Sequence, residues 1–184
     1  MRVIAGTAKG TNLYSLTGKD TTRPTTDRAK QKLFDSLQNY ILKPENVLDL
    51  FAGSGALGIE ALSRGATHVE FVEKNRFAAD IIRKNLEKTH LSQKSIIHVM
   101  DAFFYLTKLA DSKFDLIFAD PPYKSGFTKR LLWLIETNKL LNVNGFFVVE
   151  DASDQKIELS EALQLINTKV TGKTTHYIFQ NTNE

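Results

Sequence analysis

The feature that most constrains this chain is residues 47–64, where an apolar run leads into closely spaced glycines and then into a helical pattern. Residues 47–51, Val-Leu-Asp-Leu-Phe, predict a buried strand, and Gly53, Gly55 and Gly58 follow it. A strand, a glycine turn and a helix open the ligand-binding unit of Rossmann-like folds. Glycines let the backbone approach a ligand, and the helix start offers unpaired N–H groups. The stretch therefore predicts a cofactor site at the turn.

Asp49, inside the predicted strand, favours one kind of cofactor over another. A dinucleotide would bring its pyrophosphate close to this acid, which would repel it. S-adenosylmethionine has no phosphate and carries an α-ammonium group that an acid suits. The alternative is that Asp49 only caps the turn, since a buried charge needs a partner. The residues expected around S-adenosylmethionine here are Asp49, Phe51, Ala52, Gly53, Ser54, Gly55 and Gly58.

The composition excludes several classes of protein. The 184 residues are enough for one domain with a sizeable core. There is no Cys, and the four His residues lack ligand spacing, so we expect neither disulfides nor a metal site. No apolar run approaches the length of a membrane span, and the N-terminus does not read as a signal peptide. We expect a cytoplasmic monomer that does not bind a membrane.

Basic residues concentrate in a predicted N-terminal extension, residues 1–43. Two short strand-like runs, 2–5 and 12–16, predict a hairpin, and a helix is expected from Thr25 or Thr26 to about residue 41. Residues 1–32 carry seven Lys or Arg against two Asp, while the whole chain has a net charge of only +3. This asymmetry indicates a face that meets a polyanion, although a solvated surface is the plainer alternative. The candidate RNA contacts are Arg2, Lys9, Arg23, Thr25, Arg28 and Lys32.

Residues 44–184 alternate strand and helix patterns, which favours a mostly parallel sheet. Helices are expected over residues 127–141 and, weakly, 155–165. The last two strands, 166–171 and 175–180, flank a turn and predict an antiparallel hairpin.

Two of these strands end in groups that suit a nucleoside. In an open parallel sheet, ligands bind at the carboxyl ends of the strands. Glu73, followed by Lys74, ends the second strand and can accept hydrogen bonds from both ribose hydroxyls. After the third strand, Asp101 can accept from the adenine amino group, and the Ala102 N–H can donate to the ring. The alternative for Asp101 is a helix N-cap, and both roles can hold.

The fourth strand ends in the strongest signal, Asp120-Pro121-Pro122-Tyr123. The prolines remove two backbone donors and leave carbonyl acceptors. With the Asp120 carboxylate, these acceptors match the two hydrogens of an exocyclic amine. Tyr123 supplies a flat face on which a base can stack. The motif therefore predicts an active site for methylation of a base nitrogen.

These motifs together resemble the nucleic-acid amino-methyltransferases. The family similarity is to RsmD, and it rests on residues 2–6 with 9–10, the Arg-Pro-Thr-Thr-Asp-Arg block 23–28 with Leu33-Phe34, and the block 49–66. The resemblance implies a Rossmann-like class I methyltransferase with a seven-stranded sheet, using S-adenosylmethionine. It implies transfer of a methyl group to the N2 of a guanine in 16S ribosomal RNA, within the small subunit or an assembly intermediate.

Other functions stay open at this level. An N6-adenine methyltransferase would share the Asp-Pro-Pro-Tyr motif. A nicotinamide dehydrogenase is disfavoured by Asp49, and an inactive RNA-binding module by the intact set of glycines and acids. Arg28 has a second possible role, since it can clamp the cofactor carboxylate instead of a phosphate.

Overall fold

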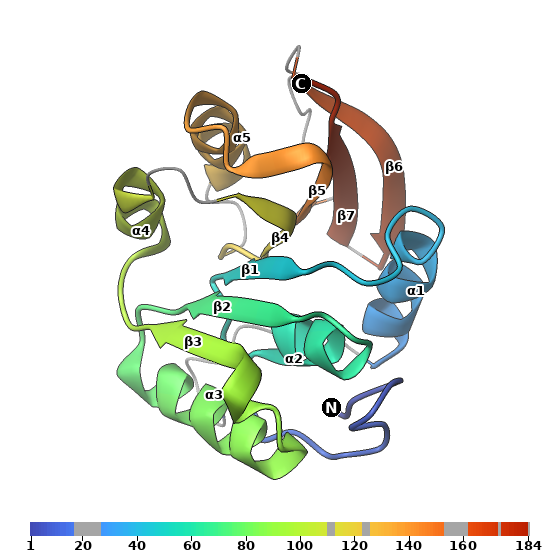
Figure 1. The fold of residues 1–184 in the computed structure, drawn as a ribbon, viewed down its shortest axis with the longest axis vertical. Coiled ribbons are helices and arrows are strands. Elements are labelled where there is room, and N and C mark those ends of the chain that lie inside the picture. The colour runs from blue at the N-terminus through green and yellow to red at the C-terminus, as the bar shows by residue number, and fades with distance from the viewer. Residues whose placement is uncertain (17–26, 110–112, 123–125, 153–161, 173, 184) are drawn as a thin grey trace.

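A seven-stranded sheet runs through the protein in a computed structural model that describes residues 1–16, 27–109, 113–122, 126–152, 162–172 and 174–183 (Figure 1). The strands lie side by side in the order β3 (Ser95–His98), β2 (His68–Val72), β1 (Asn46–Leu50), β4 (Phe114–Ala119), β5 (Leu141–Ala152), β7 (Thr174–Asn181) and β6 (Leu163–Thr171). Strand β7 is antiparallel to both of its neighbours, whereas β1 to β5 pair in parallel. The predicted mostly parallel sheet with a closing antiparallel hairpin is confirmed.

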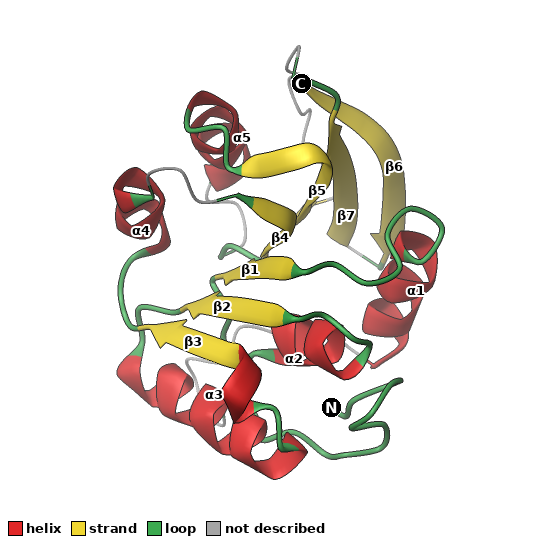
Figure 2. Cartoon of the chain, in the orientation of Figure 1, coloured by secondary structure: helices red, strands yellow, loops and turns green. Residues whose placement is uncertain are grey.

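Helices cover both faces of the sheet (Figure 2). One face packs against α1 (Asp27–Leu37), α2 (Ala56–Ser63) and α3 (Arg76–Thr89), and the other against α4 (Ala102–Lys108) and α5 (Phe127–Thr137). A short 3₁₀ turn (Ser92–Lys94) precedes β3. Along β1, Val47 packs in the core on the α1, α2 and α3 side of the sheet, while Leu48 and Leu50 pack in the core on the α4 and α5 side. Because strands covered on both faces bury every side chain, they read as continuous apolar runs in the sequence.

The N-terminal segment packs onto α2 rather than forming the two predicted strands. Its pairing is a single antiparallel bridge between Arg2 and Asn12, and the Val3 N–H donates to the Thr11 carbonyl at 3.0 Å. A Cβ at Gly6 would lie 1.7 Å from the Ser63 carbonyl oxygen, so only glycine allows this close approach. The N-terminus therefore lies beside α2, as Figure 1 shows.

Two predicted helix ends are corrected by the structure. Helix α1 ends at Leu37, because the Tyr40 N–H bonds back three residues, to the Leu37 carbonyl, and closes the last turn. Tyr40, three residues past this end, is 42% exposed. Helix α5 ends at Thr137 rather than residue 141, and the backbone turns through Lys139 at a positive φ of 51°. The predicted caps Thr25 and Thr26 lie outside the described residues.

The helix predicted over residues 155–165 is wrong in its described part. Residues 163–165 open β6, and Leu163 and Leu165 pair with Asn181 and Phe179 of β7. Pairing with a neighbouring strand outweighs the weak local helical pattern. Residues 155–161 lie outside the described residues. In the described ranges, no helix has both the length and the apolar character needed to span a bilayer.

Candidate active site

The glycine turn after β1 is built from residues in the left-handed backbone region. Phe51, Gly53 and Gly55 have φ values of 56°, 55° and 76°. This conformation is costly for Phe51, about 1–3 kcal/mol. Aromatic contacts on the α4 and α5 side of the sheet hold the Phe51 ring. Its centre lies 6.2 Å from that of the stacked Phe127 ring and 5.9 Å from that of Phe103, which it meets edge-on. The turn is thus fixed by packing before any ligand arrives.

Helix packing requires glycine at position 58. A Cβ there would lie 2.4 Å from the Phe71 ring, so glycine allows α2 to pack closely against β2. At Gly55 a Cβ would lie 3.2 Å from the Ile82 side chain of α3. Glycine thus lets α2 pack closely on β2 at position 58 and lets α3 approach the turn at position 55.

Asp49 is almost fully buried beneath the turn, with 2% of its surface exposed. Its carboxylate accepts the N–H of Gly58, in the first turn of α2, at 2.9 Å. Burial raises the pKa of Asp49 to about 7, and the neighbouring Glu73 also raises it, against the lowering effect of the Gly58 bond. Asp49 also lines the pocket described below. It therefore caps α2 and faces the pocket, so both roles considered for it are compatible.

Glu73 joins the glycine turn to the start of α3. Its carboxylate accepts the N–H of Gly53 at 2.9 Å and the N–H of Asn75 at 2.8 Å. Its own N–H donates to the His98 carbonyl of β3 at 3.1 Å. A carboxylate has about four acceptor positions, so two bonds leave capacity for hydroxyl donors from a ligand.

The ends of β3 and β4 complete the carboxyl edge of the sheet. Asp101 is exposed and caps α4 by accepting the Phe104 N–H at 3.0 Å. The Asp120 N–H donates to the Leu50 carbonyl at 3.5 Å, which ties the end of β4 to the end of β1. Pro121 is buried and Pro122 is exposed. Tyr123 lies outside the described residues.

One pocket collects most of the predicted residues. Of those expected from the sequence, the lining includes Asp49, Phe51, Ala52, Gly53, Ser54, Glu73, Lys74, Ala102, Asp120 and Pro122. Gly55, Gly58, Asp101 and Pro121 are not part of the lining. Sequence reasoning missed their lining neighbours Ala56, Leu57, Val72, Asn75 and Ala78. It also missed Met1, Ser15 and Leu16, which the N-terminal segment brings from far along the chain and which no local pattern marks.

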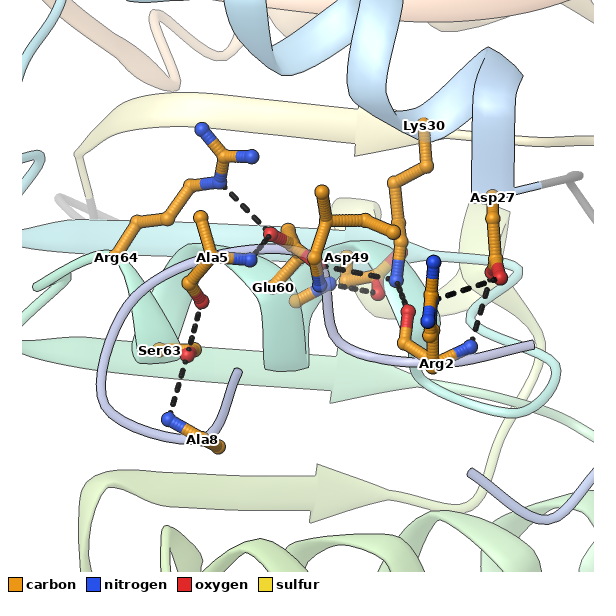
Figure 3. A network of polar contacts seen from close by, with 11 residues as sticks. Arg2, Ala5, Ala8, Asp27, Lys30, Asp49, Glu60, Ser63 and Arg64 are labelled. Atoms are coloured by element: carbon orange, nitrogen blue, oxygen red, sulfur yellow. Dashed lines mark hydrogen bonds and ion pairs between the residues drawn. The ribbon is translucent and has the colours of Figure 1, made fainter. Parts of the chain in front are cut away.

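A buried polar network anchors the N-terminal segment to α2 (Figure 3). The Glu60 carboxylate, fully buried, forms an ion pair with Lys30 at 3.0 Å and with Arg64 at 2.8 Å. It also accepts the N–H groups of Ile4 and Ala5 at 2.8 and 3.0 Å. Lys30, counted above with the basic residues that meet a polyanion, is instead fully buried. The sequence does contain a signal for this burial: Lys30 lies three and four residues before Leu33 and Phe34, and therefore on the same buried face of the helix.

The other candidate RNA contacts differ in their surroundings. Arg2 is exposed and forms an ion pair with Asp27 at 3.6 Å. Lys9, Arg28 and Lys32 are exposed. Arg23 and Thr25 lie outside the described residues.

The fold and the pocket together define a class I methyltransferase that uses S-adenosylmethionine. The residues suit this cofactor: Glu73 offers acceptors for a ribose diol, and Asp49 offers a buried carboxylate for an ammonium group. Two acids beneath the glycine turn would disfavour a pyrophosphate. When bound, S-adenosylmethionine supplies a methyl group activated on a sulfonium.

Comparison with known proteins gives the family. The chain belongs to the family described as Conserved hypothetical protein 95, whose model matches residues 1–180. It is 36% identical to a Haemophilus influenzae protein named Ribosomal RNA small subunit methyltransferase D, over 98% of this chain and 94% of that protein. The Escherichia coli protein of the same name is 30% identical, over 98% of this chain and 89% of that protein. The solved structure of Escherichia coli yhhF, 30% identical, superposes with a TM-score of 0.86 and covers 100% of this chain and 99% of that one. The resemblance to the RsmD family is confirmed.

Proposed function

We propose that this protein transfers a methyl group from S-adenosylmethionine to the exocyclic N2 of a guanine in 16S ribosomal RNA. The observation that carries the proposal is the shared pocket of Asp120, Pro122, Glu73 and the glycine turn. It joins an amine-accepting loop to a cofactor site. The names of the relatives supply the ribosomal RNA of the small subunit as the substrate class.

In the proposed mechanism, the loop after β4 holds the amine by its hydrogens. The Asp120 carboxylate and a loop carbonyl accept hydrogen bonds from the two N–H groups of the guanine amine. This arrangement turns the lone pair of the nitrogen out of conjugation with the ring. Asp120 also stabilises the positive charge that develops on the nitrogen. Because the amine loses a proton only once it has become cationic, Asp120 need not be a strong base. Most of the rate enhancement then comes from positioning.

A stacked or paired guanine must be turned out of its helix to reach this pocket, where Tyr123 would stack on the base. Residues 1–43 form the RNA-facing extension and residues 44–184 the catalytic core. Arg2, Lys9, Arg23, Thr25, Arg28 and Lys32 contact phosphates. The protein acts as a cytoplasmic monomer on the small subunit or an assembly intermediate.

Asp120→Asn tests the chemistry. It keeps the size of the side chain, removes the negative charge, and can turn an –NH₂ toward the substrate amine. In single-turnover methylation of small-subunit particles that lack the methyl group, we expect the rate to fall by about 10²–10³-fold. Affinity for S-adenosylhomocysteine, measured by calorimetry, should change little. A fully active variant would refute the role of the loop.

Mass mapping tests the substrate. Ribosomal RNA from cells lacking the protein should miss one N2-methylguanine of 16S RNA. The parent gene should restore it, and the Asp120→Asn gene should not. Loss of an N6-methyladenine instead would assign the protein to the adenine enzymes.

A further inference from the structure

Asn85, a residue of α3 outside the pocket, is fully buried. It lies on the apolar stripe of the helix with Ala78, Ile82 and Leu86. An amide side chain has a cost at such a position unless its hydrogen bonds are made. The partners of Asn85 therefore show why a polar residue occupies this site.

The hydrogen bonds that the Asn85 side chain makes within the described residues all go to backbone groups distant in sequence. Its Oδ1 accepts the Tyr14 N–H at 2.7 Å, and its Nδ2 donates to the Tyr14 carbonyl at 3.0 Å. The same Nδ2 donates to the Ser54 carbonyl at 2.9 Å. Asn85 thus pairs with Tyr14 as a neighbouring strand would, and uses its other N–H to hold the glycine turn.

These partners belong to two different walls of the cofactor pocket. Ser54 lines the pocket from the glycine turn. Tyr14 directly precedes Ser15 and Leu16, which line it from the N-terminal segment. Asn85 itself is not part of the lining, so it joins the two walls from behind.

Other contacts hold the N-terminal segment without tying it to the glycine turn. The Leu13 N–H donates to the Met1 carbonyl at 2.9 Å, and the Lys88 ammonium lies 4.4 Å from the centre of the Tyr14 ring. Glu60 holds Ile4 and Ala5, and the Ser63 hydroxyl accepts the Ala8 N–H at 2.9 Å. Glu60 and Ser63 belong to α2, and the residues that they hold come before residues 14–16 in the N-terminal segment. Among the described residues, the hydrogen bonds that join the backbone of residue 14 to the glycine turn are those of Asn85.

We propose that Asn85 is a positioning residue for the cofactor, which holds the Ser15–Leu16 wall against the glycine turn so that both walls contact S-adenosylmethionine. The proposal concerns only cofactor binding, so it does not depend on which RNA is methylated. It assigns a functional reason to a buried amide that touches neither cofactor nor substrate.

Asn85→Asp tests the proposal with almost no change in size. The carboxylate keeps one acceptor for Tyr14, but places oxygen against the carbonyls of Tyr14 and Ser54. Asn181, in β7 next to the edge strand β6, provides a control with matched hydrogen bonds outside the pocket lining. Its Nδ2 donates to the carbonyls of Leu141 and Asn142 at 3.2 and 3.1 Å, and its Oδ1 accepts the Asn183 N–H at 3.2 Å. Asn181→Asp therefore breaks the same pattern of bonds far from the pocket.

Binding of S-adenosylhomocysteine to each purified protein is measured by calorimetry, together with its thermal stability. We expect Asn85→Asp to weaken binding about tenfold or more, and Asn181→Asp to bind within about twofold of the parent. If Asn85→Asp does not fold, Asn85→Ser removes the same donors with a smaller disturbance and should weaken binding in the same direction.

Hydrogen exchange separates positioning from general stability. In the parent, S-adenosylhomocysteine should slow amide exchange at both residues 14–16 and residues 53–55. In Asn85→Ser it should slow exchange at 53–55 only. Unchanged affinity in the Asn85 variants, equal weakening by Asn181→Asp, or retained protection at 14–16 would each overturn the proposal. Failure of the RNA assays above would leave these results unaffected.

Discussion

Replacing Glu60 by Gln is the sharpest test of how the N-terminal segment is held. Glu60 and Lys30 are both fully buried, and the carboxylate contacts Lys30, Arg64 and two backbone N–H groups (Figure 3). Glutamine keeps the shape and one acceptor oxygen. It removes the charge that compensates the Lys30 ammonium and brings an –NH₂ against donors that need an acceptor.

The expected loss is large compared with the stability of a typical domain. Removing one partner of a buried ion pair costs about 3–5 kcal/mol, against a total of about 5–15 kcal/mol. With a urea m value of about 2 kcal/mol/M, the unfolding midpoint should fall by about 2 M. Circular dichroism during urea titration measures this shift directly.

The pH dependence identifies Lys30 as the cause. Burial lowers the pKa of Lys30, and Glu60 opposes that shift, so the pKa should fall further in Glu60→Gln. Between this lowered value and the ordinary lysine pKa of about 10.4, the native state binds fewer protons than the unfolded state. Stability that depends on this group therefore rises with pH. The deficit of Glu60→Gln relative to the parent should shrink as the pH rises toward the ordinary lysine pKa of about 10.4.

Two further variants complete this test. Adding Lys30→Met to Glu60→Gln removes the uncompensated charge and should recover much of the loss. Asp80→Asn breaks the exposed pair between Asp80 and Arg83, and should cost no more than about 1 kcal/mol. A loss below about 1 kcal/mol in Glu60→Gln, or a deficit that does not change with pH, would refute the reasoning.

Three other predictions follow from the pocket and the N-terminal surface. Burial raises the pKa of Asp49 to about 7, so binding of S-adenosylhomocysteine near that pH should release protons and should weaken as the pH falls. Calorimetry in buffers of different ionisation enthalpy measures the proton release, which should be absent in Asp49→Asn. Glu73→Ala should weaken the same binding by about 2–3 kcal/mol, and Glu73→Gln, which keeps one acceptor, by less; equal affinities would show that Glu73 does not hold the ribose. Replacing Arg28 and Lys32 by Gln should flatten the salt dependence of RNA binding by about 0.7–0.9 per lost phosphate contact. The exposed Lys113, just before β4, is the control, and Lys113→Gln should leave the slope unchanged.

Local patterns were enough to predict the fold and much of the pocket. The strand, glycine turn and helix around Asp49 lie next to one another in the sequence, so their arrangement follows from short-range rules. Glu73 and Asp120 were found because parallel strands bring their carboxyl ends to one edge. Each of these inferences needs the position of a residue within its own strand, and no knowledge of distant partners.

Contacts between distant parts of the chain could not be predicted in the same way. Lys30 reads as a surface charge until Glu60, thirty residues away, is placed beside it. Asn85 carries a signal, since it is three residues after Ile82 on a buried stripe, but the pattern does not identify Tyr14 or Ser54 as partners. The start of β6 was mistaken for a helix because β7, its partner strand, decides its conformation.

The two buried polar anchors share a feature that relates stability to function. Glu60 lies on α2 and Asn85 on α3, and both helices begin at the pocket, with Ala56 and Ala78 in its lining. Apolar side chains at the anchor positions would also exclude water, and replacing a buried ion pair by well-packed apolar groups is often neutral or stabilising. Apolar contacts are not directional, so they would let the N-terminal segment slide along these helices. Directional bonds to the backbone of residues 4, 5 and 14 fix its register, and with it the placement of Ser15 and Leu16 at the cofactor.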